Sequence, residues 1–263
     1  MSKKEVLKKN LDIIFGLLVL YLGVMGYLYI FQRSFMYFPG DARGHVWEYK
    51  ILEPSPLKVT TDDGVFLTGL FWPPKNRGGA TFVYFHGNTQ EYSYRFQKVK
   101  SLLDEGYGVL FAEYRGYGGN EGIPTEDGLY NDARAYIQAL DSQYDIKPQN
   151  MVFYGESLGT GVAVQMANEF PAAALILESA YDSTLSVAKN TYWMFPLNLL
   201  MHDQYRSVDK VSNLKMPVLM MHGANDETIP LTHAENLYNA IQSTKKLIVV
   251  EGAGHNDLYD FGA

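Results

Sequence analysis

The chain has 263 residues, of which 47% are hydrophobic, and it contains no cysteine. This hydrophobic fraction supports a full core and excludes a disordered chain, and the lack of cysteine excludes disulfides, thiolate metal sites and a cysteine nucleophile. The formal net charge is −7 at pH 7. Nucleic acid is not an expected partner, because its phosphates require clustered lysine and arginine side chains.

The first predicted element is a membrane-spanning helix at residues 13–31. Its sequence, IIFGLLVLYLGVMGYLYIF, has no charged residue, and about 20 apolar residues cross the hydrocarbon core of a bilayer as a helix. A cleaved signal peptide would have a shorter apolar run and a small-residue exit, whereas this run ends in bulky Tyr29, Ile30 and Phe31. We therefore expect an uncleaved signal anchor. A cleaved signal peptide and a buried core helix are the alternatives.

Charged residues beside this helix predict its orientation. Four lysines precede it: Lys3, Lys4, Lys8 and Lys9. Only Arg33 closely follows it, so the positive-inside rule places residues 1–12 in the cytoplasm and the folded domain outside the cytoplasm. Four aromatic residues are expected to form a belt at the far interface: Tyr27, Tyr29, Tyr37 and Phe38.

After a connecting segment at residues 32–56, the remaining residues 57–263 alternate strand-type runs with helix-type stretches. The expected strands are residues 57–61, 65–72, 81–85, 108–113, 151–154, 174–178, 218–221 and 247–250. The expected helices are residues 92–105, 126–144, 158–169 and 232–243. The first two strands flank Asp62-Asp63-Gly64, which is typical of an antiparallel hairpin, and several later strands are apolar throughout, as in a parallel sheet. The pattern predicts an α/β fold with a largely parallel sheet, and we expect the apolar insertion at residues 183–211 to form a small lid.

A candidate nucleophile follows the strand at residues 151–154. The pentapeptide Gly155-Glu156-Ser157-Leu158-Gly159 joins this strand to a predicted helix. The two glycines allow the backbone to reverse sharply, and such a corner holds the serine hydroxyl above the edge of the sheet. Ser157 is therefore the predicted nucleophile.

A serine hydroxyl needs an adjacent base that a carboxylate orients. Asp226 follows the penultimate strand and His255 follows the last strand. Both should rise at the same carboxyl edge of the sheet as Ser157, so we predict Asp226 as the acid and His255 as the base. Asp226 could instead cap the next helix, His255 could be an ordinary loop histidine, and Asp182 is the competing acid.

An acyl-transfer site also needs donors for the developing oxyanion. We expect the backbone N–H groups of Leu158, directly after the nucleophile, and of Asn88, in the loop after the strand at residues 81–85. His86 and His222, each followed by glycine, are interpreted as structural. No metal is expected, because no histidine and carboxylate cluster has ligand spacing.

Five motifs in order resemble those of the α/β-hydrolase superfamily. The motifs are Arg33-Ser34-Phe35-Met36-Tyr37-Phe38-Pro39-Gly40, His86-Gly87-Asn88, Glu113-Tyr114-Arg115-Gly116-Tyr117-Gly118, Gly155-Glu156-Ser157-Leu158-Gly159-Thr160-Gly161 and His222-Gly223-Ala224-Asn225-Asp226. Within the superfamily the chain is similar to the membrane-anchored group that includes the bud-emergence suppressor (Bem-like) hydrolases and the alpha/beta hydrolase domain-containing proteins. The resemblance implies an eight-stranded, mostly parallel sheet with an antiparallel N-terminal strand and helices on both faces.

The same resemblance implies roles for individual residues. Ser157 matches the family's nucleophile, Asp226 its acid and His255 its base, and the loop at residues 114–118 matches one beside the active site. In that loop we expect Arg115 to pair with a carboxylate. Such hydrolases usually end in a long helix, whereas only residues 256–263 follow His255, so we expect the sheet to be less covered near its last strand.

Together these patterns predict a membrane-anchored serine hydrolase that cleaves an ester or thioester of a lipid or other acyl substrate. The reaction would proceed through an acyl-enzyme on Ser157 and would need no cofactor. The alternatives are a serine peptidase or amidase of the same fold and a non-catalytic, membrane-tethered scaffold.

Overall fold

A computed structural model of the protein describes residues 2–39, 53–76, 78–89 and 93–262. Most of the connecting segment 32–56 and the expected helix start at Tyr92 lie outside these residues.

Eight strands form one sheet in the order β1-β2-β4-β3-β5-β6-β7-β8. Their bounds are β1 Ser55–Thr60, β2 Phe66–Trp72, β3 Thr81–Phe85, β4 Gly108–Phe111, β5 Met151–Glu156, β6 Ala174–Glu178, β7 Val218–Gly223 and β8 Lys245–Val250. Strand β2 runs antiparallel to both of its neighbours, and the pairs from β4 through β8 are all parallel. The predicted α/β fold with a largely parallel sheet is confirmed.

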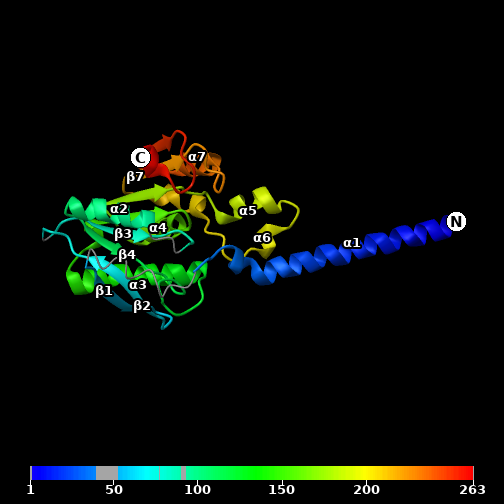
Figure 1. Ribbon diagram of the computed structural model, residues 1–263, viewed down its shortest axis with the longest axis horizontal. Helices are drawn as coiled ribbons and strands as arrows, with labels where there is room; N and C mark the ends of the chain where they lie inside the picture. Colours follow the sequence, from blue (N-terminus) through cyan, green and yellow to red (C-terminus); the bar gives the residue numbers. More distant parts are fainter. Residues whose placement is uncertain (1, 40–52, 77, 90–92, 263) are drawn as a thin grey trace.

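Helices cover both faces of this sheet (Figure 1). Helices α3 (Glu126–Tyr144), α4 (Leu158–Glu169) and α7 (Leu231–Ala240) contribute to one apolar cluster, and α2 (Ser93–Asp104) contributes to the other. Side chains alternate along β5 between the two clusters, with Phe153 in the first and Tyr154 in the second. The carboxyl ends of the parallel strands consequently meet at one edge, where the connecting loops can place functional groups.

Helix α1 (Lys3–Phe31) leaves the domain as a long rod, with the N-terminus far from the sheet (Figure 1). A capping box between Ser2 and Glu5 starts it, and none of its residues is buried. Among the described residues, this one helix is long and apolar enough to cross a membrane. After the 3₁₀ turn η1 (Gln32–Phe35), the chain enters the domain.

Tyr37 differs from the expectation of an aromatic belt. Its side chain is only 5% exposed and lies in the larger apolar cluster, and its hydroxyl is 3.0 Å from that of Tyr205. Phe38 pairs with Thr89 in an isolated parallel bridge. Residues 36–38 therefore pack as part of the folded domain, because a buried partner for the phenol hydroxyl outweighs solvation at an interface.

The insertion at residues 183–211, here called the lid, consists of short helices and turns. These are α5 (Thr184–Tyr192), α6 (Leu197–Leu200), η4 (Ser207–Asp209) and, at its end, η5 (Val211–Asn213). The Ser183 side chain caps α5 by accepting a hydrogen bond from the Ser186 N–H. In Figure 1, α5 and α6 lie beside the C-terminal part of α1. The remaining short elements are η3 (Pro148–Asn150), before β5, and η6 (Leu258–Phe261), after β8.

Candidate active site

Ser157 lies on a strained corner between β5 and α4. All of β5 is buried, α4 starts at Leu158, and the Ser157 backbone has φ 50° and ψ −118°, outside the regions that a serine usually adopts. The Ser157 N–H donates to the Glu178 carbonyl at 2.9 Å, and the Thr160 hydroxyl donates to the Ser157 carbonyl at 2.6 Å. These bonds hold the corner in place.

Glycine is required beside this corner because the chain approaches β3 closely. A Cβ atom at Gly159 would lie 2.0 Å from the Phe85 carbonyl oxygen, and one at Gly155 would lie 2.6 Å from the Gly159 oxygen. No side chain fits at either position. The two glycines of the pentapeptide therefore allow the turn that places Ser157 at the sheet edge.

The structure brings the predicted nucleophile, base and acid together. Ser157 Oγ lies 2.9 Å from His255 Nε2, and His255 Nδ1 lies 2.7 Å from Asp226 Oδ2. With its proton on Nδ1, the His255 ring donates to the Asp226 carboxylate and leaves Nε2 free to accept the proton of Ser157. The three side chains form one continuous chain of hydrogen bonds.

Asp226 is held as an anion in a closed environment. Its side chain is fully buried, and Oδ1 accepts hydrogen bonds from the Thr228 and Ile229 N–H groups at 2.9 and 2.8 Å. Burial alone would raise the pKa of Asp226, but the hydrogen bond with His255 and the charge of that ring outweigh it and lower the pKa below its ordinary value. The carboxylate therefore stays charged at neutral pH.

The contacts of Asp226 differ from those that the alternatives would make. Asp226 does not cap α7, whose N-cap residue is Pro230 without a side-chain hydrogen bond. Asp182 lies 2.9 Å from His233 Nδ1 and also bonds the Ser186 hydroxyl. Asp182 thus contacts residues of the lid and of α7, whereas Asp226 contacts His255.

The backbone around His255 is also fixed. Its carbonyl accepts a hydrogen bond from the Ser179 hydroxyl at 3.0 Å, and the Gly254 N–H donates to Asp257 Oδ1 at 2.7 Å. His222, expected to be structural, is fully buried, with Nε2 2.8 Å from the Ile229 carbonyl and 3.3 Å from Asp226 Oδ2. Burial lowers the pKa of His222, so this ring is a neutral support for the loop that carries Asp226.

The two residues whose backbone N–H groups are predicted to hold an oxyanion belong to segments that adjoin Ser157. Leu158 is the first residue of α4, and Asn88 follows Gly87, where a Cβ atom would lie 3.4 Å from Ser157 Cβ. The Asn88 side-chain amide donates to the Met36 carbonyl at 3.1 Å. The backbone carbonyl of Asn88 accepts from the Phe38 N–H at 3.0 Å. The loop after β3 is thereby tied to the chain that leaves α1.

A buried ionic network beneath Ser157 was not predicted from the sequence. Arg95 donates to Glu156 Oε1 at 2.9 and 2.8 Å and to the Thr89 carbonyl at 2.7 Å, and Lys98 lies 3.1 Å from Glu156 and 2.6 Å from Glu178. Burial opposes ionisation of Glu156, but Arg95 and Lys98 outweigh it and hold its pKa well below the usual value. The signal in the sequence was Glu156 itself, since a carboxylate inside a buried strand needs a cation.

This network joins the nucleophile strand to the loop that carries Asn88. We expect Lys98→Met to lower the free energy of unfolding by about 3–5 kcal/mol, because the buried Glu156 and Glu178 would lose the cation that pairs with both. Lys100→Met is the matched control: Lys100 pairs with Asp104 on the exposed side of α2, and loss of such a pair costs about 0.5 kcal/mol. Urea unfolding of the detergent-solubilised protein measures both, and equal losses in the two variants would contradict the assignment.

His86 is a structural histidine at the base of the same loop. It is almost fully buried, its Nδ1 lies 2.7 Å from the Gly87 carbonyl, and its ring packs in a tilted arrangement against Tyr114 with centroids 4.3 Å apart. Burial lowers the pKa of His86 to about 3, and the Arg95 charge adds to this effect.

The shift at His86 predicts a pH dependence of stability. The folded protein takes up the proton only near pH 3, whereas the unfolded chain takes it up at the ordinary value of 6.5. The free energy of unfolding is therefore highest above pH 6.5 and falls between pH 6.5 and 3, by up to about 1.4 kcal/mol per pH unit from this group. We expect His86→Asn to reduce this slope in unfolding curves at pH 4.5 to 7.5, and the exposed-residue variant His202→Asn to leave it unchanged. An unaltered slope in His86→Asn would show that other groups cause it.

The Tyr114–Gly118 loop has the structural role expected for Arg115. Arg115 bonds Asp132 with its Nε at 2.9 Å and Asp63 with Nη1 and Nη2 at 2.6 and 2.9 Å. These bonds join the β1–β2 hairpin to α3. Among the described residues, no group of three or more histidine and carboxylate side chains could hold a metal ion.

The sheet topology, the helices on both faces and the loops at its carboxyl edge define a hydrolase of the α/β-hydrolase superfamily. Residues 92–259 match the model of the prolyl oligopeptidase family (Peptidase_S9). The chain therefore belongs to the prolyl oligopeptidase family within this superfamily.

Relatives and solved structures agree with this assignment. The chain is 37% identical to protein Rv2307c of Mycobacterium tuberculosis over 238 residues, which cover 89% of this chain and 84% of the relative. It is 32% identical to alpha/beta hydrolase domain-containing protein 17B of Homo sapiens, over 82% of this chain and 75% of the relative. The esterase Pf2001 of Pyrococcus furiosus matches with a TM-score of 0.67 at 22% identity, over 86% of this chain and 92% of that structure. At this identity the structural match concerns the fold.

Proposed function

We propose that the protein is a serine hydrolase that cleaves an ester or thioester through an acyl-enzyme on Ser157. The observation that carries this proposal is the unbroken series of hydrogen bonds from Ser157 through His255 to the buried Asp226, with distances of 2.9 and 2.7 Å. This is the arrangement in which a serine hydroxyl becomes nucleophilic at neutral pH.

The reaction has two halves that use the same groups. Ser157 Oγ attacks the acyl carbonyl while His255 Nε2 takes its proton, and the Leu158 and Asn88 N–H groups stabilise the oxyanion. The tetrahedral intermediate then breaks its bond to the leaving alcohol or thiol, which receives the proton from His255. Water attacks the acyl-enzyme in the second half, His255 takes one proton from it, and Ser157 regains that proton as the carboxylic acid leaves. These steps use only side chains, backbone N–H groups and water.

The substrate class is proposed from the lid. Large apolar side chains on it face away from the core, with Trp193 75% exposed and Leu199 83% exposed. Exposed apolar groups of this size mark a surface for lipid or another apolar partner. A lipid or acyl ester, or an acyl thioester, fits this surface better than a small polar ester does.

A panel of substrates tests the proposal with the full-length protein in nanodiscs. Acyl p-nitrophenyl esters, acyl thioesters and acyl p-nitroanilides of the same chain length are compared, and the acyl-enzyme is trapped and located by peptide mass spectrometry. We expect turnover of esters or thioesters with the acyl group on Ser157. An acyl group on another residue would contradict the proposal, and no acylation with any substrate would favour the scaffold alternative.

Peptide or amide hydrolysis is the second candidate function, and the match to the prolyl oligopeptidase family favours it. The same triad can cleave either bond, since the chemical steps differ only in the leaving group. In the panel, a kcat/KM for the anilides or for N-blocked peptides above that for the esters would establish a peptidase.

We further propose that α1 anchors the protein, with the folded domain outside the cytoplasm. We expect the protein to remain in the membrane pellet after carbonate extraction and protease added to spheroplasts to digest the domain. Four lysines lie at the N-terminal end of α1, before its uncharged stretch at residues 13–31, and only Arg33 closely follows that stretch. A variant in which glutamine replaces Lys3, Lys4, Lys8 and Lys9 removes this bias and should give mixed orientations. A domain protected in the wild type would reverse the proposed orientation.

A further inference from the structure

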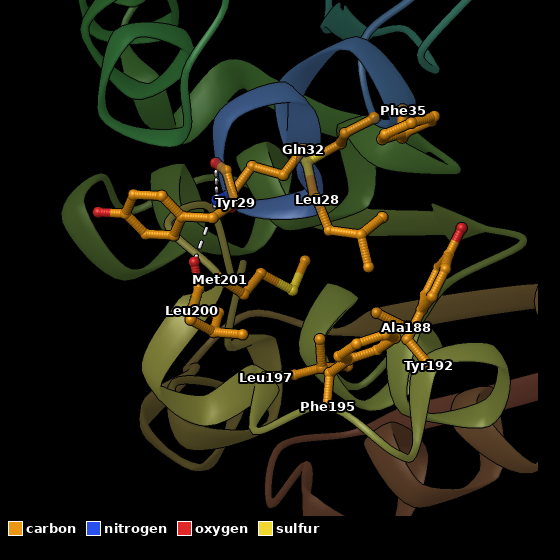
Figure 2. A pocket seen from close by; sticks show the side chains of 11 residues that line it. Leu28, Tyr29, Gln32, Phe35, Ala188, Tyr192, Phe195, Leu197, Leu200 and Met201 are labelled. Carbon is orange, nitrogen blue, oxygen red and sulfur yellow. Dashed lines mark hydrogen bonds between the residues drawn. The ribbon is translucent and has the colours of Figure 1, made fainter. Parts of the chain in front are cut away.

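The C-terminal part of α1 and the lid together line a partly open apolar cavity of about 150 Å³. Leu28 of α1 and the lid residues Met201, Leu197 and Phe195 surround this space, with Ala188 and Tyr192 of α5 beside Phe195 (Figure 2). A dry apolar cavity of about this volume accommodates a molecule of benzene. The cavity therefore fits part of a hydrocarbon chain and is unsuited to a charged headgroup.

The lid is docked on α1 at several points along the helix. The Tyr21 hydroxyl donates to the Met194 carbonyl at 2.8 Å, and the Tyr21 ring stacks on Phe195 with centroids 5.2 Å apart. Farther along, Gln32 donates to the Leu200 carbonyl at 3.0 Å and accepts from the His202 N–H at 2.7 Å. Polar backbone groups within a bilayer need partners in the protein, and side chains of α1 supply them to the lid.

These contacts set the position of the lid along α1, and therefore its depth when α1 spans a bilayer. Tyr21 and Phe31 are about 15 Å apart along α1, at 1.5 Å per residue, and a hydrocarbon core is about 30 Å thick. When α1 spans a bilayer, the tip of the lid lies level with hydrocarbon, where its exposed Trp193 and Leu199 are solvated by lipid. The ion pair between Arg33 and Asp203, at 2.8 Å, lies at the polar end of the same contact.

Met36 links the cavity to the candidate active site. Met36 lines the cavity, and the Met36 carbonyl accepts the hydrogen bond from the Asn88 side chain. Asn88 belongs to the loop proposed to stabilise the oxyanion. A chain in the cavity would consequently contact Met36, whose carbonyl is bonded to that loop.

We propose that this cavity binds the acyl chain of a membrane phospholipid, which enters sideways from the bilayer between α1 and the lid. The inference rests on the proposed function and names its substrate class. In this arrangement α1 is both the anchor and one wall of the binding site.

Photocrosslinking tests the site without requiring turnover. The full-length chain carrying Ser157→Ala is placed in nanodiscs that contain phosphatidylcholine with a diazirine in one acyl chain, and adducts are located by mass spectrometry. We expect adducts on Tyr192 and Phe195. Adding Ala188→Trp, which fills the cavity, should lower them by about tenfold, whereas Thr191→Trp on the exposed side of α5 should change them by less than about twofold.

A second variant and a kinetic measurement keep the test decisive. Leu28→Trp fills the cavity from α1. It replaces Ala188→Trp in the test if Ala188→Trp disrupts the lid. In the active protein, either cavity variant should lower the ratio of kcat/KM for hexadecanoyl over butanoyl esters by about tenfold. Lid adducts that are absent, or unchanged in both cavity variants, would overturn the acyl-chain site. Adducts that respond as expected in a protein that hydrolyses no ester would keep the site and reject the proposed function.

Discussion

Replacing Ser157 by alanine is expected to lower kcat by about 10⁶-fold, the size of loss seen when the nucleophile of a serine protease is removed. No other group lies at hydrogen-bond distance from His255 Nε2 in the manner of the Ser157 hydroxyl at 2.9 Å, within the part of the chain that the structure describes. Covalent labelling by a fluorophosphonate should disappear together with activity. Intact-mass measurement before and after treatment detects one adduct on the wild type.

Ser142→Ala is the matched control for this change. The Ser142 hydroxyl bonds the Gln138 carbonyl on the exposed side of α3, outside the candidate active site. This variant should keep both its activity and its single adduct. Labelling that survives in Ser157→Ala would assign the nucleophile to another residue.

Asp226→Asn is expected to lower kcat by about 10⁴-fold with little loss of structure. An asparagine amide can donate to His255 Nδ1, which favours the wrong ring tautomer and removes the negative charge that stabilises the imidazolium. Steady-state kinetics on an ester that the wild type cleaves measures the loss, and circular dichroism confirms that the fold is kept.

The control for the acid is Asp182→Asn, which also alters a buried carboxylate bonded to a histidine. Asp182 contacts His233 and the start of α5, so its replacement should affect the lid and change kcat far less. A loss of about 10⁴-fold in Asp182→Asn, together with an active Asp226→Asn, would exchange the two assignments.

Elements with strong local signals were predictable from the sequence. Helix α3 has its expected bounds because Thr125 caps its first turn and Asp145 ends it in a left-handed conformation. Helix α7 ends at Ala240, three residues earlier than expected, because Ile241 becomes extended and buries its side chain in the core. A helix end that depends on tertiary packing leaves little trace in the local sequence.

The proximity of Ser157, Asp226 and His255 was predictable because each follows a strand of a parallel sheet, and such strands share one carboxyl edge. The partners of Arg95 and Lys98 were not, since charged residues on an amphipathic helix are normally expected in solvent. Nor were the contacts of Tyr21 with the lid, which join residues more than 170 positions apart. Contacts of this kind depend on the assembled fold rather than on local pattern.

The backbone conformation at Ser157 is unfavourable for a serine and favourable for a glycine. Its positive φ belongs to a region that glycine enters freely and that costs other residues about 1–3 kcal/mol. Glycine in place of Ser157 would therefore give a more stable corner between β5 and α4, but one without a hydroxyl. A serine at this position therefore lowers the stability of the corner, and this cost is consistent with its proposed role as the nucleophile.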